Sequence, residues 1–129
     1  MEAEPTGWRA MLHRFLASRA EVEAAEERIE VRRSGTTPVV DLDDRTRVEV
    51  SGVLRSVTVR PGSQVPALEA DLFDGSGVLR IVWLGRRRIR GIGPGRRLRA
   101  AGRVSLTPDG PVMYNPRYEL SPSPLTEET

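Results

Sequence analysis

The basic side chains of this sequence are the residues best suited to a chemical role. All 20 of them are arginines, and none is lysine. A guanidinium group is planar, permanently charged and weakly hydrated, so it contacts phosphates and stacks on rings better than an ammonium group does. Residues 47–120 hold 13 arginines against six carboxylates, a formal charge of +7, whereas residues 1–46 carry −3 and the last nine carry −2. The basic middle segment predicts an anionic partner, unless the arginines only reflect a bias in composition.

The candidate contacts for such a partner are eight arginines and one tyrosine. Some of these arginines alternate away from the apolar positions of the strands predicted below, and others form a basic cluster that connects two strands. Arginines contact the backbone of a nucleic acid and aromatic rings stack on its bases, so we expect weak binding with little sequence preference. The predicted contact residues are Arg80, Arg86, Arg87, Arg88, Arg90, Arg99, Arg103, Tyr114 and Arg117.

The sequence offers little for catalysis. It has no cysteine and a single histidine, His13, so neither a thiolate site nor a catalytic triad is expected. The acidic run at 41–44 matches only half of a calcium-binding loop, and a phosphate-binding loop of the usual type would need a lysine. Glu69 and Asp71 are the only support for a phosphate-ester hydrolase. We therefore expect no enzymatic activity, no cofactor and no metal.

Residues 1–33 form the predicted helical segment. They are rich in Ala, Glu, Arg and Leu and contain no proline or glycine after Gly7, so a helix is expected from about residue 8 to residue 33. A capping box formed by Ser18 and Glu21 would allow a break between two helices. A stripe of apolar residues must pack on the rest of the chain or on another chain, and it is too short to establish a coiled coil. Its members, seven residues apart, are Trp8, Phe15, Val22 and Ile29.

A linker is predicted at residues 34–46. The run from Ser34 to Pro38 contains turn-forming residues, and the acidic stretch after it has neither helical nor strand periodicity. From residue 47 onward the apolar period changes to two, which is typical of short strands separated by turns. Strands are expected at about 47–60, 68–73, 78–84, 97–106 and 111–120, with a bulge at Gly52, hairpin turns at 74–77 and 107–110, and an interruption at Asn115-Pro116.

These strands predict a mainly β fold. Five alternating strands leave their apolar faces exposed unless the sheet curls and closes, so we expect a five-stranded antiparallel barrel over residues 47–120, preceded by the helical segment. Strict alternation also buries Trp83. The tail at 121–129 is expected to be disordered. The predicted core residues are Leu68, Leu72, Leu79, Ile81, Leu98 and Val104.

Local residues in this segment resemble a known family. The runs concerned are Leu72-Phe73-Asp74-Gly75-Ser76-Gly77, Leu79-Arg80-Ile81-Val82-Trp83-Leu84, Gly95 ahead of Gly102-Arg103-Val104, and Met113-Tyr114-Asn115-Pro116-Arg117-Tyr118-Glu119. With them, residues 47–120 resemble nucleic-acid-binding OB domains. The segment is most similar to the wedge domain of RecG-type branch-migration helicases and to short stand-alone actinobacterial OB-fold proteins. The resemblance implies an OB-fold barrel and favours single-stranded or branched DNA over RNA as the partner.

Two functions remain open at this point. The leading one is a non-catalytic OB-fold protein that binds nucleic acid, and the alternative is a protein-interaction OB module whose N-terminal helix binds a partner or self-associates. Residues 1–5 are acidic where a signal peptide would be basic, and apolar runs are short. We therefore expect a cytoplasmic protein with no membrane partner.

Overall fold

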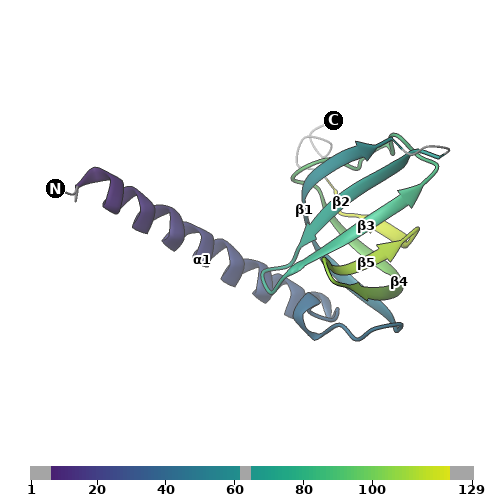
Figure 1. Ribbon diagram of the computed structural model, residues 1–129. Coiled ribbons are helices and arrows are strands. Elements are labelled where there is room, and N and C mark those ends of the chain that lie inside the picture. The colour runs from purple at the N-terminus through teal and green to yellow at the C-terminus, as the bar shows by residue number, and fades with distance from the viewer. Residues whose placement is uncertain (1–6, 62–64, 123–129) are drawn as a thin grey trace.

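The computed structural model describes residues 7–61 and 65–122 of the chain (Figure 1). Within these residues a long helix is followed by a short 3-10 helix and by six strands. The predicted disordered tail lies outside the described residues, apart from Ser121 and Pro122. The elements are α1 (Trp8–Ser34), η1 (Val39–Asp41), β1 (Arg47–Arg60), β2 (Ala67–Phe73), β3 (Val78–Leu84), β4 (Arg97–Thr107), β5 (Gly110–Tyr114) and β6 (Arg117–Leu120).

α1 is one continuous helix of 27 residues, with no break at Ser18. It ends where Gly35 adopts a left-handed backbone, with φ of 73°, and donates its N–H to the carbonyl of Arg32 at 3.2 Å. A residue without Cβ adopts this conformation at little cost, so the glycine terminates the helix. No helix in the described part of the chain combines the length and the apolar character needed to cross a membrane.

α1 projects away from the strands, and only its C-terminal turns approach them (Figure 1). The apolar stripe, expected to pack on the rest of the chain or on another chain, is therefore not buried within one chain. Trp8, Phe15 and Val22 are 69%, 56% and 53% exposed. Packing of this stripe on the rest of its own chain is therefore wrong, and packing on another chain stays a prediction.

The C-terminal end of α1 is held on the strands by polar contacts and one buried side chain. Val31 is buried, and Arg28 donates a hydrogen bond from Nη1 to the carbonyl of Gly75 at 2.8 Å. The hydroxyls of Ser34 and Thr36 both hydrogen-bond that of Ser51 in β1, at 2.9 and 2.8 Å. These contacts fix the direction in which the helix leaves the strands.

Residues 34–46, the predicted linker, pack on the strands with Val39 and Leu42 buried in the core. Asp74, in the hairpin between β2 and β3, is 1% exposed and accepts the backbone N–H of Val39 at 2.7 Å. Its other carboxylate oxygen accepts from Ser76 N, Ser76 Oγ and Gly77 N at 2.8, 2.7 and 3.1 Å. One carboxylate thus closes the predicted hairpin at 74–77 and ties the segment before β1 to it.

Five strands pair in a closed ring. The sheet order is β1-β2-β3-β5-β4-β6, and an additional pairing between β1 and β4 joins the two sides. We call β1, β2, β3, β5 and β4 the five-strand ring; β6 extends it beside β4. β3 and β5 run parallel, with Val82 opposite Tyr114, so the sheet is mixed and not antiparallel throughout as predicted.

The last predicted strand is divided into β5 and β6, which makes six strands instead of five. Asn115 adopts a left-handed backbone, with φ of 48°, and Pro116 has no N–H to donate. Together they end β5 and shift the register with β4 by one residue, so that β6 continues along the same edge of β4. The interruption predicted at this dipeptide is confirmed.

The bulge in β1 lies between Leu54 and Ser56, where the register with β2 shifts, and not at the predicted Gly52. Gly52 serves a different purpose, because a Cβ at this position would collide with the carbonyl oxygen of Phe73. The glycine permits the close approach of two backbones.

The core fills the inside of the five-strand ring, as the two-residue periodicity predicts. The six predicted core residues, Leu68, Leu72, Leu79, Ile81, Leu98 and Val104, are all 3% exposed or less. Arg80 and Arg99 lie outside this core, which confirms the register assigned to β3 and β4. Trp83 is also buried, at 5% exposure.

Candidate nucleic-acid interface

The structure distributes the nine predicted contact residues over three regions. Arg80 and Tyr114 lie on the outer side of β2, β3 and β5, which we call the β2–β3–β5 face. Three arginines of β4 and β6 lie on the outer side of β1, β4 and β6, the β1–β4–β6 face. Residues 85–96, between β3 and β4, form the third region, the arginine loop. The arginines of the second region are Arg99, Arg103 and Arg117, and those of the loop are Arg86, Arg87, Arg88 and Arg90.

The arginine loop is anchored at its middle by an apolar side chain. Ile89 is 6% exposed and belongs to the core, and its carbonyl accepts the N–H of Ile92 at 3.0 Å. The arginines on both sides of Ile89 are exposed. Within residues 7–61 and 65–122, no carboxylate lies within 4.0 Å of a guanidinium nitrogen of these four arginines. The loop therefore presents four positive charges without local compensation.

Tyr114 lies beside the strand from which the arginine loop departs. The backbone N–H of Asn115 donates to the carbonyl of Val82 at 2.7 Å. The side-chain Oδ1 of Asn115 accepts the N–H of Leu84 at 3.0 Å. These two bonds hold the end of β5 against the end of β3, two residues before the first loop arginine. The Tyr114 side chain is 53% exposed, so its ring can stack on a base.

The other aromatic side chains of the five-strand ring and β6 are less accessible to a ligand. Trp83 is buried, and Tyr118 packs edge-on against it with ring centroids 5.7 Å apart. The guanidinium carbon of Arg55 lies 3.6 Å from the ring centroid of Phe73, so a cation already covers that ring. Tyr114 is consequently the aromatic residue best placed for a contact with a base.

The β2–β3–β5 face contains a hollow of about 330 Å³ in which positive charges are already paired. Arg80 Nε lies 3.6 Å from Asp71 Oδ1, and Arg60 Nε lies 3.0 Å from Glu69 Oε2. Asp109 also lines the hollow, so three carboxylates stand against two guanidiniums. Phosphates are disfavoured there, and Arg80 is not available as an uncompensated cation.

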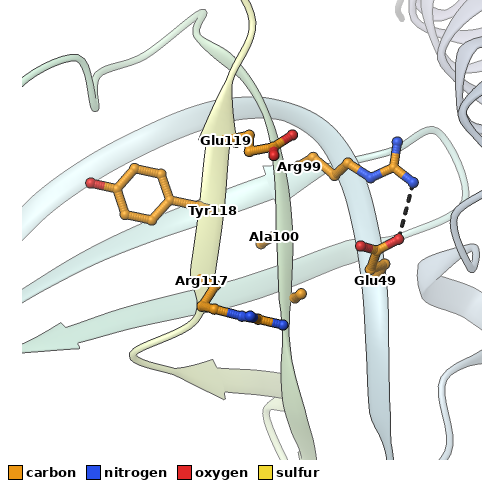
Figure 2. Close-up of a pocket in the computed structure, with 7 residues that line it drawn as sticks. Glu49, Arg99, Ala100, Arg117, Tyr118 and Glu119 are labelled. Carbon is orange, nitrogen blue, oxygen red and sulfur yellow. Dashed lines mark hydrogen bonds and ion pairs between the residues drawn. The ribbon is translucent and has the colours of Figure 1, made fainter.

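The β1–β4–β6 face has a hollow of about 340 Å³ whose lining contains two guanidiniums and two carboxylates (Figure 2). Arg99 donates from Nη2 to Glu49 Oε1 at 3.0 Å, across neighbouring strands. Arg117 lies on the same side, and Tyr118 points to the other side of β6 (Figure 2). Arg103 stands directly opposite Arg47 in the pairing of β4 with β1. Arg47 was not among the predicted contacts, although its alternation in β1 could have identified it.

The nine predicted residues therefore do not form one surface. The arginine loop and Tyr114 come together at one end of β3 and β5. Arg99, Arg103 and Arg117 form a separate basic region, because the ring turns β4 and β6 to a different side. The strand alternation that places these side chains outside the core does not say which side of a closed ring they occupy.

Comparison with known proteins gives similarity at the level of the fold. No family model matches the chain, and no curated protein matches it. Among solved structures, a chain from a structure of RecG bound to a three-way DNA junction is similar, with a TM-score of 0.53 and 21% sequence identity. The similarity covers 65% of this chain and 12% of the other chain. This protein thus corresponds to a small part of the length of that chain.

Proposed function

We propose that this protein binds DNA without catalysing a reaction, and that the arginine loop and Tyr114 make the contact. The observation that carries the proposal is the loop itself. Four arginines are exposed on both sides of the buried Ile89, and none has a carboxylate partner among the described residues. Arg60 and Arg80, by contrast, each lie within 4.0 Å of a carboxylate.

The fold supports this proposal, and we assign the five-strand ring to the OB-fold. OB-folds bind oligonucleotides with strands 2 and 3 and with the loops that join strands 1 to 2 and 4 to 5. The arginine loop joins β3 to β4 instead, but it begins beside the β1–β2 connection, because Gly85 donates its N–H to the carbonyl of Pro66 at 2.7 Å. The similar chain comes from a complex with a branched DNA, which favours single-stranded or branched DNA over RNA as the ligand here. The carboxylates of Glu69 and Asp71 make the β2–β3–β5 face unfavourable for phosphates, so we place the ligand at the loop end of that face.

The proposed contact uses charge and stacking. Each guanidinium that contacts a phosphate displaces a condensed counterion, so affinity falls steeply with salt. The Tyr114 ring stacks on any base, and few rigid polar groups point outward to read base edges. We therefore expect weak binding with little sequence preference.

The test is a fluorescence-anisotropy titration of the full chain with single-stranded, duplex and forked DNA and with matched RNA, at several salt concentrations. With about 3 to 5 phosphate contacts, log K against log salt should slope at roughly −2 to −3.5 on single strands. The triple variant R86A/R87A/R88A should flatten this slope by about 2. The matched control, R99A/R103A/R117A, removes the same charge from the β1–β4–β6 face and should leave the slope nearly unchanged.

Two further variants separate charge from stacking. R86K/R87K/R88K keeps the three charges and should keep the slope. Tyr114→Ala should weaken binding by about 1–3 kcal/mol with the slope intact, whereas Tyr114→Phe keeps the ring and should retain affinity. Absence of any binding at low salt would overturn the proposed function. Flattening by R99A/R103A/R117A instead of the loop variant would overturn the proposed site.

A further inference from the structure

We propose that the protein is a homodimer in which α1 pairs with α1 of a second copy in antiparallel orientation. The inference starts from the apolar stripe, which is extended on the same side of the helix by Met11. These residues are large, close together and in water in the single chain. Such a stripe is unusual on a helix that has no partner. The exposed fractions are 69% for Trp8, 67% for Met11, 56% for Phe15, 53% for Val22 and 48% for Ile29.

The ring cannot cover this stripe, because it already packs on the other side of α1. A Cβ at Gly75 would meet Ala24, Arg28 hydrogen-bonds Gly75, and Val31 is buried. Successive residues of a helix are 100° apart, so Ala24 points about 200° away from Val22, and Val31 about 200° away from Ile29. The stripe faces away from its own ring, and its partner must be another helix or surface.

The charges beside the stripe oppose a parallel pair. The stripe residues Trp8, Phe15, Val22 and Ile29 recur every seven positions. In a parallel coiled coil, the residue directly before each of them faces the residue five places further along the partner helix. In α1 every such pair carries charges of the same sign. The pairs, with the second residue on the second copy, are Arg14 with Arg19, Glu21 with Glu26 and Arg28 with Arg33.

In an antiparallel pair, the side chains that face one another across the two helices are complementary in size. The register that places Trp8 opposite Ala25 of the second copy sets each large residue against a small or medium one, as close packing requires. The layers are then Trp8 with Ala25, Met11 with Val22 and Phe15 with Ser18, each occurring twice by two-fold symmetry.

The same register pairs opposite charges. In an antiparallel coiled coil, the residues that directly precede the stripe residues face one another across the two helices. Arg14 precedes Phe15 and Glu21 precedes Val22, so Arg14 lies opposite Glu21 of the second copy. The two-fold axis repeats this pair. The helix is therefore self-complementary in both size and charge, which favours a second copy over an unrelated partner.

The geometry leaves room for both rings. The overlap extends from residue 8 to residue 25 of each copy, about 27 Å of helix, so it covers the stripe from Trp8 to Val22 and leaves Ile29 outside. The ring contacts extend from Ala24 to Ser34 on the helix side opposite the stripe, and most of them lie beyond the overlap. The two rings then lie at opposite ends of the paired helices and do not collide.

The mass of the full chain in solution tests the pairing. Sedimentation equilibrium over a range of concentrations should give twice the chain mass of 14.3 kDa at the upper end. Phe15→Glu should raise the dissociation constant at least about tenfold, because it places a charge in the apolar layer. The control is Leu16→Glu, since Leu16 is equally exposed but lies outside the pairing side. A monomer at all concentrations would overturn the proposal.

A charge exchange tests the orientation. Arg14→Glu should weaken the antiparallel dimer because the new carboxylate would face Glu21 of the second copy, and R14E/E21R should restore it. A parallel dimer responds in the opposite way, because the first change removes the repulsion between Arg14 and Arg19. Strengthening by the single change would therefore overturn the antiparallel arrangement.

Engineered cysteines test the register directly, since the natural chain has none. Mixed under mild oxidation, M11C and V22C chains should form the mixed disulfide in preference to either symmetric one. Circular dichroism of each variant verifies that the helix is retained. A predominant M11C–M11C product would indicate parallel pairing, and no cross-link in a mixture of dimeric mass would show that another register is used.

Discussion

The guanidinium of Arg97 in β4 donates two hydrogen bonds to the carboxylate of Glu27 in α1, 70 positions earlier in the chain. One of them, from Nη1 to Oε2, measures 3.0 Å. The hydrogen bond to Glu27 raises the pKa of Arg97, against the lowering effect of its partial burial. Glu27 is 13% exposed and Arg97 36% exposed, so the pair is partly screened from water. Among the described residues it is the one ion pair that joins α1 to the ring.

Loss of this ion pair should loosen the end of α1. Glu27→Gln removes the charge that Arg97 requires, and we expect a loss of about 1–2 kcal/mol in unfolding free energy, less than for a fully buried pair because water reaches Arg97. Urea denaturation measures the loss. Glu23→Gln, which affects an exposed pair with Arg19, should change stability by no more than about 0.5 kcal/mol. Equal effects of the two variants would contradict the role of Glu27.

Removal of the Asp74 carboxylate should destabilise the whole ring. Asp74→Ala leaves four donors without their acceptor, two of them backbone groups of the hairpin and one the N–H of Val39. We expect a loss of about 2–4 kcal/mol, measured by urea or thermal unfolding. Asp109→Ala, in the exposed turn between β4 and β5, is the matched control and should be within about 0.5 kcal/mol of the natural chain. A variant at Asp74 that unfolds like this control would refute the assignment.

A side chain at Gly52 should be poorly tolerated. In Gly52→Ala the new methyl group meets the carbonyl oxygen of Phe73 and a methyl of Leu72, so β1 and β2 must separate. We expect a cost of about 1–3 kcal/mol. Gly93→Ala provides the comparison, because nothing lies within 4 Å of its Cβ position and its φ is not positive. That substitution should leave the melting temperature unchanged or raise it slightly.

Neutralising the acidic side chains of the β2–β3–β5 face should strengthen DNA binding. E69Q/D71N releases Arg60 and Arg80 from their ion pairs next to Tyr114. If each released arginine contacts one phosphate, the salt slope becomes steeper by about 1.4 on single strands. The titration described above measures it. The control E49Q/E119Q changes the same charge on the β1–β4–β6 face, and a stronger effect of that control would move the interface there.

The in-and-out arrangement of the strands could be predicted from the sequence because alternation is a local property. The alternation of Leu79, Arg80 and Ile81 indicates which of these side chains face the core, whichever strands lie beside β3. The parallel pairing of β3 with β5 could not be predicted in this way, because periodicity does not specify which strand lies beside which. The position of the bulge depends on the register between β1 and β2, so Leu54 carries no local sign of it.

The candidate site was predictable only in part for the same reason. The cluster around Ile89 was evident from its composition, but the ion pairs of Arg80 and Arg99 depend on neighbours 9 and 50 positions away. The α1 stripe was expected to pack on the rest of the chain or on another chain, and the first alternative is wrong because the ring contacts occupy the opposite side of the helix. The role of Asp74 beyond its own hairpin required knowledge of where Val39 would pack.

The two tryptophans lie in opposite surroundings, and this gives the natural chain two optical probes. Trp8, near the far end of α1, is open to water, whereas Trp83 is enclosed in the core behind Tyr118. A soluble quencher such as iodide should reach the first indole and not the second. Red-shifted, quenchable emission then reports on the helix end, and the shielded emission reports on the ring. Contact between helices and unfolding of the ring can therefore be followed separately, without any attached label.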